Sequence, residues 1–250
     1  MSSAYNTTKE EVTSLLKDAG YAAGEVSNAL KSVYNSGLNA TANVLKDAGY
    51  AVGGVTSGLK SVYNLNSYRT DVYKIASALK DAGYGVTEVS SAIRSNFGSS
   101  LGRMAKALES AGYAVGGVTS ALKSVYNLKN YSSHVKDTVS VLKNAGYEAT
   151  EVTGAIRSNF GSSLDRMAKT LKNVGYDLTK VGSALKSVYN PSADAMAGAL
   201  KDAGYELKEV GDYLKKGLGY GKKTVKKALK SAGYSNKQIK KAFGWLSSLF

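Results

Sequence analysis

The chain has 250 residues and carries 33 lysines and arginines against 19 acidic side chains, which gives a formal net charge of +14 at neutral pH. It has no cysteine and a single histidine, so disulfides, thiolate metal sites and multi-histidine metal clusters are excluded. An apolar fraction of 43% suffices for a packed core, and no apolar run is long enough for a transmembrane helix.

One motif, L-x-x-x-G-Y, recurs eight times along the chain. It occupies residues 16–21, 45–50, 79–84, 108–113, 142–147, 171–176, 200–205 and 229–234. Successive motif tyrosines are 29, 34, 29, 34, 29, 29 and 29 residues apart. Residues 50–112 also align with residues 113–175 without a gap, which indicates tandem duplication. Repetition at this period is typical of solenoids, so we predict one continuous array of stacked units.

Each unit is predicted to be a hairpin of two helices. In one unit, the apolar residues before the motif tyrosine are Leu101, Met104, Ala105, Leu108 and Ala111. In the first unit, those after the tyrosine are Val26, Ala29, Leu30, Val33 and Tyr34. Both sets follow the spacing of one helical face, and the alternation typical of strands is absent. The predicted fold is therefore all-α, with two-helix repeats of 29–34 residues stacked as an α-solenoid or superhelical array.

Glycine, asparagine and serine mark where the predicted helices begin and end. The motif glycine is expected in a left-handed conformation just beyond the first helix, with the motif tyrosine folded back as a staple rather than exposed as a binding ladder. Asparagine or glycine is expected to end the second helix in the same way. Ser235 and Gln238 predict a capping box for the last helix. Insertions near residues 65–69 and 128–132 predict a longer loop or an added turn.

A cation follows the motif tyrosine by ten residues in seven of the eight units. These candidates for polyanion binding are Lys31, Lys60, Arg94, Lys123, Arg157, Lys186 and Lys215. Stacked repeats would align them into a cation stripe able to hold the backbone of a nucleic acid or another polyanion. The alternative is a solvated helix face copied by duplication.

The basic charge is concentrated at the C-terminal end. Asp212 is the last acidic residue, and residues 213–250 hold ten lysines. We therefore divide the chain into a seven-unit array, residues 1–212, and a basic capping repeat with an aromatic tail, residues 213–250. Candidates for membrane or partner binding are Lys222, Lys223, Lys226, Lys227, Lys230, Lys237, Lys240, Lys241, Trp245 and Phe250. This end is a cap for the core, an interfacial membrane segment, or a surface for nucleic acid or another acidic partner.

The sequence offers little for catalysis. It has no cysteine nucleophile, phosphate-binding loop, nucleophile elbow or metalloprotease motif. The single histidine, His134, falls beside an insertion and is expected at the surface. We therefore predict no catalytic, cofactor-binding or metal-binding residues, no small-molecule substrate and no enzymatic activity. The first residues lack the apolar stretch of a secretory signal, so we expect a cytoplasmic protein that lysis could release.

The repeat resembles several helical-repeat arrays. Transcription activator-like effectors have a similar repeat length, but their variable junction corresponds to a near-constant Ala-Gly-Tyr here. Mitochondrial transcription termination factors also have a leucine-rich helix and a Gly-Tyr or Gly-Phe turn, but their repeats contain recurrent prolines and this chain has one proline. The string LKxAGYxxxEVxxALKxVYN also resembles short tandem repeats of bacterial proteins, some of them toxin-like. The resemblance covers residues 10–245 and implies a tandem two-helix fold without an activity.

Three functional hypotheses follow. The leading one is a non-enzymatic helical-repeat protein of structural type that acts by binding or self-assembly, as a homo-oligomer or by head-to-tail stacking of its end repeats. The second is a membrane-active or toxin-like protein that docks on anionic lipid through the basic C-terminal end. The third is a protein that binds nucleic acid or another polyanion along the cation stripe.

Overall fold

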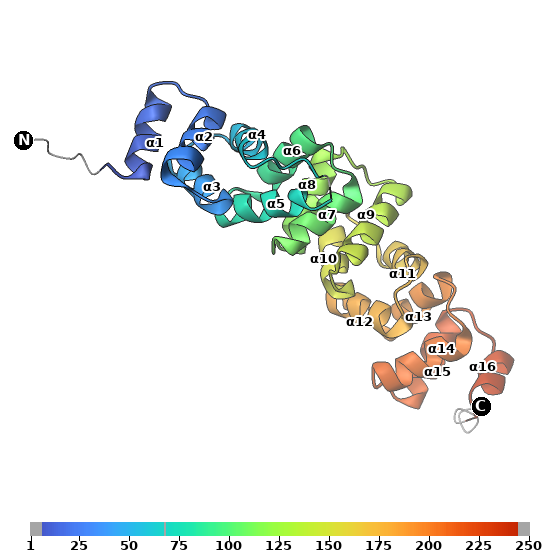
Figure 1. The fold of residues 1–250 in the computed structure, drawn as a ribbon. Coiled ribbons are helices and arrows are strands. Elements are labelled where there is room, and N and C mark those ends of the chain that lie inside the picture. The colour runs from blue at the N-terminus through green and yellow to red at the C-terminus, as the bar shows by residue number, and fades with distance from the viewer. Residues whose placement is uncertain (1–6, 68, 245–250) are drawn as a thin grey trace, which may run out of the picture. The chain divides into compact units, whose positions relative to one another are not determined.

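A computed structural model of the protein describes residues 7–67 and 69–244. Within these ranges the chain forms sixteen α-helices and one π-helical segment, without strands (Figure 1). Most helices pack on a neighbour in sequence and on the second helix along, so the predicted all-α, solenoid-like array of helical repeats is confirmed. The chain divides into two compact units, residues 1–128 and residues 129–250.

The first unit holds four hairpins. Their helices are α1 (Lys9–Asp18), α2 (Ala23–Tyr34), α3 (Leu38–Asp47), α4 (Val52–Val62), α5 (Asp71–Asp81), α6 (Val86–Phe97), α7 (Leu101–Ser110) and α8 (Val115–Val125). The first helices of the hairpins, α1, α3, α5 and α7, pack side by side in one layer, and the second helices form the other layer (Figure 1). The core lies between the two layers, because the apolar stripe of each helix faces its neighbours in both layers.

The second unit repeats this arrangement. Its elements are α9 (Ser132–Ala145), α10 (Ala149–Phe160), α11 (Leu164–Asn173), α12 (Leu178–Tyr189), α13 (Ala193–Asp202), α14 (Leu207–Asp212), the π-helical segment η1 (Tyr213–Gly217), α15 (Lys222–Ser231) and α16 (Asn236–Ala242). Gly182 has no side chain, and the ring of Tyr213 packs directly on its backbone. The charge boundary placed after residue 212 falls within the continuous helical segment of α14 and η1, and the last hairpin begins at Lys222.

The motif glycine and tyrosine form the predicted cap in all eight repeats. In the first repeat, the Gly20 amide donates to the Lys17 carbonyl at 2.8 Å and the Tyr21 amide donates to the Leu16 carbonyl at 3.0 Å. These two bonds are those of a Schellman motif, which requires the left-handed φ of +88° found at Gly20. The motif leucine is fully buried from the second repeat to the eighth.

Polar caps fix most of the other helix ends as expected. Asn35, Asn64, Asn127 and Asn190, which end second helices, are the non-glycine residues with positive φ in the described part of the chain. The capping box of Ser235 and Gln238 is confirmed. The first-turn glutamates of the second helices also reach back to the backbone, as when Glu88 accepts a hydrogen bond from the Gly85 amide at 3.0 Å.

The two insertions form loops before α5 and α9, and each is held by a side chain at the same position of the duplication. The Asp71 carboxylate accepts from the Ser67 amide at 2.8 Å, a bond that lowers the pKa of this carboxyl group. His134, the equivalent residue, accepts through Nδ1 from the Lys129 amide at 2.9 Å. Both residues therefore anchor a loop, and this contact gives the single histidine a structural role.

The left-handed cap can be tested with a matched pair of glycines. Replacing Gly83, at φ +83°, by alanine is expected to lower the free energy of unfolding by about 1 kcal/mol, because a Cβ is strained there. Replacing Gly116, inside α8 with open space around it, by alanine is expected to raise it by about 0.5 kcal/mol. Urea unfolding midpoints of both variants check this, and equal effects would argue against the cap.

Candidate binding surfaces

The motif tyrosines link one repeat to the next. The hydroxyl of Tyr50 donates to the backbone carbonyl of Tyr21 at 2.8 Å, and the hydroxyl of Tyr84 donates to the carbonyl of Tyr50 at 2.8 Å. Tyr113 bonds to Tyr84 in the same way at 2.9 Å. This series, the tyrosine ladder, leaves the phenol groups engaged inside the protein. The alternative of an exposed ladder for a ligand therefore has no support at these positions.

A lysine from the preceding repeat covers the ring of most motif tyrosines. This clasp lysine follows the motif leucine directly, and its Nζ lies 4.3–5.9 Å from the ring centroid. The pairs are Lys17–Tyr50, Lys46–Tyr84, Lys80–Tyr113, Lys143–Tyr176, Lys172–Tyr205 and Lys201–Tyr234. Some also donate to the carbonyls that end the next first helix, as Lys143 does to Val174 at 2.7 Å. Where both contacts are made, the cation meets a ring face and the negative end of a helix.

The predicted cation stripe makes equivalent contacts in the layer of second helices. Lys31 lies over the ring of Tyr63 at 5.0 Å and donates to the carbonyl of Val62 at 2.7 Å. The further contacts between repeats are Lys60 with Phe97 and Asn96, Arg94 with Tyr126, and Arg157 with Tyr189 and Val188. Arg94 also donates to the Ser99 carbonyl and Lys186 to the Asn190 side chain, both of which are close in sequence. Lys123 and Lys215, which complete the predicted stripe, lie in α8 and η1.

These contacts give the cation stripe a structural role that sequence reasoning missed. A cation held over a ring and against a carbonyl is already partly neutralised, which leaves less of its charge for a polyanion. The signal was present in the sequence, because Lys31, Lys60, Arg94 and Arg157 are each followed by the aromatic residue at the end of the next second helix, 32–37 residues later. Binding of a nucleic acid or another polyanion by this stripe remains a prediction.

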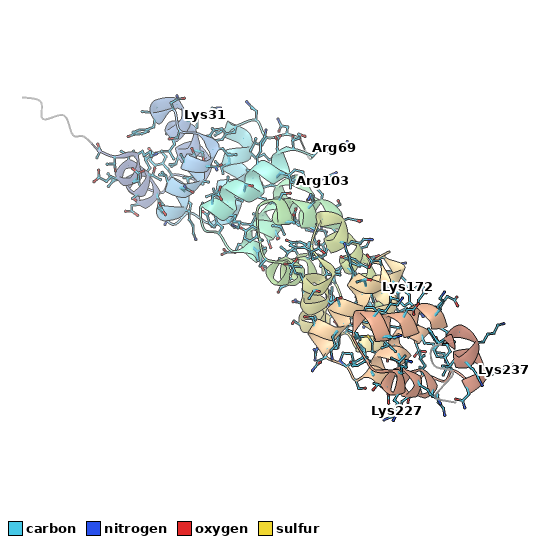
Figure 2. All side chains as sticks on the ribbon, turned by 90° about the horizontal axis from the view of Figure 1, so that it is seen from below. Lys31, Arg69, Arg103, Lys172, Lys227 and Lys237 are labelled. Atoms are coloured by element: carbon cyan, nitrogen blue, oxygen red, sulfur yellow. The ribbon has the colours of Figure 1, made fainter. Side chains whose placement is uncertain are left out.

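The C-terminal hairpin carries lysines that point to solvent. Exposed side chains on α15 and α16 are Lys222, Lys223, Lys227, Lys230, Lys237, Lys240 and Lys241, and Lys226 is half-buried. Figure 2 shows Lys227 and Lys237 on the outside of these helices. Four of the lysines, Lys223, Lys226, Lys227 and Lys230, border a hollow of about 400 Å³. Trp245 and Phe250, the aromatic candidates, lie outside the described residues.

Within each unit, the stripe of a first helix that contains the clasp lysine faces the following repeat. Four residues before the clasp position, which Glu109 occupies in the fourth repeat, the first seven repeats bury a small or β-branched side chain completely. These residues are Thr13, Ala42, Ala76, Ala105, Val139, Ala168 and Ala197. The eighth repeat has Lys226 there, and Lys222 one turn earlier. The last repeat therefore does not continue the core, which favours the interpretation of a cap.

The opposite end of the array exposes apolar side chains. On α1 and α2 and the turn between them, the exposed fractions are 63% for Leu15, 49% for Tyr21, 74% for Val33 and 39% for Tyr34. We call these four residues the N-terminal face. In the second repeat, the residue equivalent to Leu15 is Val44, which is 4% exposed. Within the described residues, no hairpin precedes the first one to cover this face.

Further hollows lie elsewhere on the described residues. Two of them, of about 410 and 360 Å³, lie along α4 and α6 and are lined mainly by serine, threonine, asparagine and glycine, with Glu88 and Lys60. In the described part of the chain, no three histidine, aspartate or glutamate side chains are close enough to hold a metal ion. No described helix has the length and apolar character to cross a membrane. The absence of enzymatic activity stays a prediction.

Comparisons with known proteins leave the family of this chain open. No protein-family model matches it, and a search of curated proteins finds no match. Function is therefore argued from the contacts and charges of the repeats themselves.

The tyrosine ladder can be tested by removing one hydroxyl. The change Tyr84→Phe leaves the carbonyl of Tyr50 without its donor, so we expect the free energy of unfolding to fall by about 1–2 kcal/mol. The matched control is Tyr21→Phe in the exposed first repeat, where we expect little change. Chemical denaturation measures both, and an equal loss in the two variants would contradict the ladder.

The buried tyrosines also predict that the protein loses stability at alkaline pH. Burial first, and nearby carboxylates second, raise the pKa of Tyr84, Tyr113, Tyr176 and Tyr205 to about 12, against 10.0 for an ordinary tyrosine. The unfolded chain releases these protons at lower pH than the folded chain. Their contribution to stability is therefore complete below pH 10 and is lost as the pH rises from 10 to 12. Ultraviolet titration of tyrosinate, with and without Tyr84→Phe, checks this.

Proposed function

We propose that the protein is a non-enzymatic helical-repeat scaffold that docks on anionic lipid surfaces through its C-terminal hairpin. The observation that carries the proposal is the set of exposed lysines on α15 and α16, together with Lys226 at a position where the first seven repeats bury a small or β-branched side chain. A cap needs only a polar surface, and acidic or uncharged residues would serve equally. The exclusive use of lysine supports a second task, which is attraction of negative charge.

The charge of this end is large for its size. Residues 213–250 hold ten lysines and no acidic residue, so ten of the fourteen net positive charges belong to the last 38 residues. A lysine near an anionic membrane contributes about 1 kcal/mol, and the attraction extends over a Debye length of about 8 Å at physiological salt. Several exposed lysines of α15 and α16 acting together supply enough attraction for reversible docking.

The residue types favour a lipid surface over nucleic acid. All ten cations of residues 213–250 are lysines, although the chain uses arginine elsewhere. Lysine is a flexible point charge suited to a diffuse layer of headgroups, whereas the planar guanidinium of arginine recognises individual phosphates and bases. A lysine-rich helix followed by an aromatic C-terminal segment is the composition of an interfacial membrane segment.

The packing of α15 sets the manner of docking. Val225, Ala228 and Leu229, the apolar face of this helix, are completely buried against the rest of the hairpin array. This helix therefore contributes its lysines and not its apolar face to the contact. Docking through α15 is electrostatic, and it weakens as salt is added.

Vesicle co-sedimentation tests the proposal. We expect binding to vesicles that contain an anionic phospholipid, little binding to neutral vesicles, and loss of binding at high salt. Changing Lys222, Lys223, Lys227 and Lys230 together to glutamine is expected to weaken binding by at least about tenfold, since each lysine contributes about 1 kcal/mol. The control variant changes four exposed lysines of the second unit, Lys129, Lys136, Lys169 and Lys180, to glutamine and has the same net charge.

Equal losses in the two variants would show that overall charge, rather than the C-terminal hairpin, drives the binding. Equal recovery with neutral and anionic vesicles would overturn electrostatic docking. Binding to duplex DNA, measured in the same buffer, tests the remaining alternative. Tighter binding to DNA than to anionic vesicles would favour a nucleic-acid partner.

A further inference from the structure

Four lysines of α15 lie on one side of the helix, around a hollow. The last three follow the first by three, four and seven residues, which places all four on a single helical face. The hollow that they border has a volume of about 400 Å³, which lies in the range of sites that hold small molecules. We call this hollow and the four side chains around it the lysine hollow. Its residues are Lys223, Lys226, Lys227 and Lys230.

This arrangement is particular to the first helix of the last repeat. When the repeats are aligned on the motif leucine, the other seven first helices have at most two lysines at these four positions. At the position of Lys223, three of them have an acidic residue instead, namely Glu10, Asp165 and Asp194. Duplication of the repeat therefore does not account for the lysine hollow, and neither does a solvated helix face copied from the other units.

The lysines of the hollow repel one another. Like charges three or four residues apart destabilise a helix, and the lysine hollow contains four such pairs. Lys223 also lies in the first turn of α15, where the positive end of the helix dipole disfavours a cation. Within the described residues, the exposed Lys223, Lys227 and Lys230 make no ion pair, hydrogen bond or ring contact. An anion bound at the hollow would relieve this repulsion.

The charge of the lysine hollow favours a ligand with more than one phosphate. An ordinary anionic phospholipid brings a single negative charge, whereas one phosphomonoester brings about 1.5–2 at neutral pH. A headgroup with two phosphomonoesters therefore matches four ammonium groups around one hollow. Lysine binds phosphate as a point charge, without the fixed fork of a guanidinium. The site would therefore select by density of charge rather than by the orientation of any one phosphate.

We propose that the lysine hollow binds one lipid headgroup that carries two or more phosphomonoester groups. The inference rests on the proposed docking on anionic lipid, and it names the headgroup that this docking prefers. The exposed lysines of α16 then add attraction to the membrane surface around the bound headgroup. A free polyphosphate shares the chemistry of such a headgroup, so the test includes a soluble one.

Co-sedimentation of the full chain with vesicles of matched surface charge tests the inference. One set contains phosphatidylinositol bisphosphate in neutral lipid, and the other contains enough phosphatidylserine to give the same total charge. We expect the bisphosphate vesicles to be bound at least about tenfold more tightly, because only they fill the lysine hollow. Soluble inositol trisphosphate is expected to compete strongly with the bisphosphate vesicles and weakly with the phosphatidylserine vesicles.

Two variants with the same net charge identify the site. The first carries Lys223→Gln, Lys227→Gln and Lys230→Gln. The second carries Lys237→Gln, Lys240→Gln and Lys241→Gln on α16, and these three lysines do not border the hollow. All six side chains are exposed, so both variants are expected to fold. Both are expected to bind phosphatidylserine vesicles more weakly and to a similar extent, and only the first is expected to lose the preference for bisphosphate vesicles.

A preference that disappears in the first variant and persists in the second supports the inference. Equal binding to the two kinds of vesicle would overturn it and leave electrostatic docking intact, and a preference that survives in the first variant would also overturn it. Calorimetric binding of inositol trisphosphate without binding to either vesicle would show that the hollow takes a free polyphosphate rather than a lipid. Absence of binding to all three probes would contradict the docking itself as well.

Discussion

The structure depends on a side chain that crosses from one hairpin to the next and meets the aromatic residue at the end of a helix. In the layer of first helices, Lys46 lies over Tyr84, whose hydroxyl bonds to the carbonyl of Tyr50. In the layer of second helices, Lys31 has the same relation to Tyr63. Several of these contacts join a cation, a ring face and a helix carbonyl, as Lys31 does with Tyr63 and Val62, and they link successive hairpins within a unit.

This use of cations explains a charge balance that looks unfavourable. The chain has 33 basic side chains, yet the described residues form three salt bridges, and all three join near neighbours in sequence. Carbonyls and aromatic rings take the place of acidic partners between repeats. A high positive charge is thus compatible with tight stacking, and acidic residues are free to serve as helix caps, as Glu25 and Glu88 do.

The local features of the fold could be predicted from sequence, and those that cross between repeats could not. Gly20 and Asn35 predict helix ends, because these residue types adopt the left-handed conformation that follows the last turn of a helix. This signal is local and can be found within a few residues of the helix end. The partners of Lys31 and Tyr50 lie about one repeat away, and periodicity alone does not say which neighbouring side chains meet. For the same reason, the sequence leaves open whether the row of cations is a binding stripe or a solvated helix face. The exposure of Leu15 and Val33 needed the packing of the first hairpin to be known.

The tyrosine ladder has a period of one repeat. The number of repeats can therefore change during evolution. The hydroxyl of Tyr84 bonds only to the turn of the hairpin before it, at Tyr50, and those of Tyr50 and Tyr113 do the same, so each of these bonds involves two adjacent copies alone. Unequal crossing-over between near-identical segments, such as residues 50–112 and 113–175, produces such changes. The number of internal hairpins can therefore change by whole copies, while the first and last hairpins stay the same.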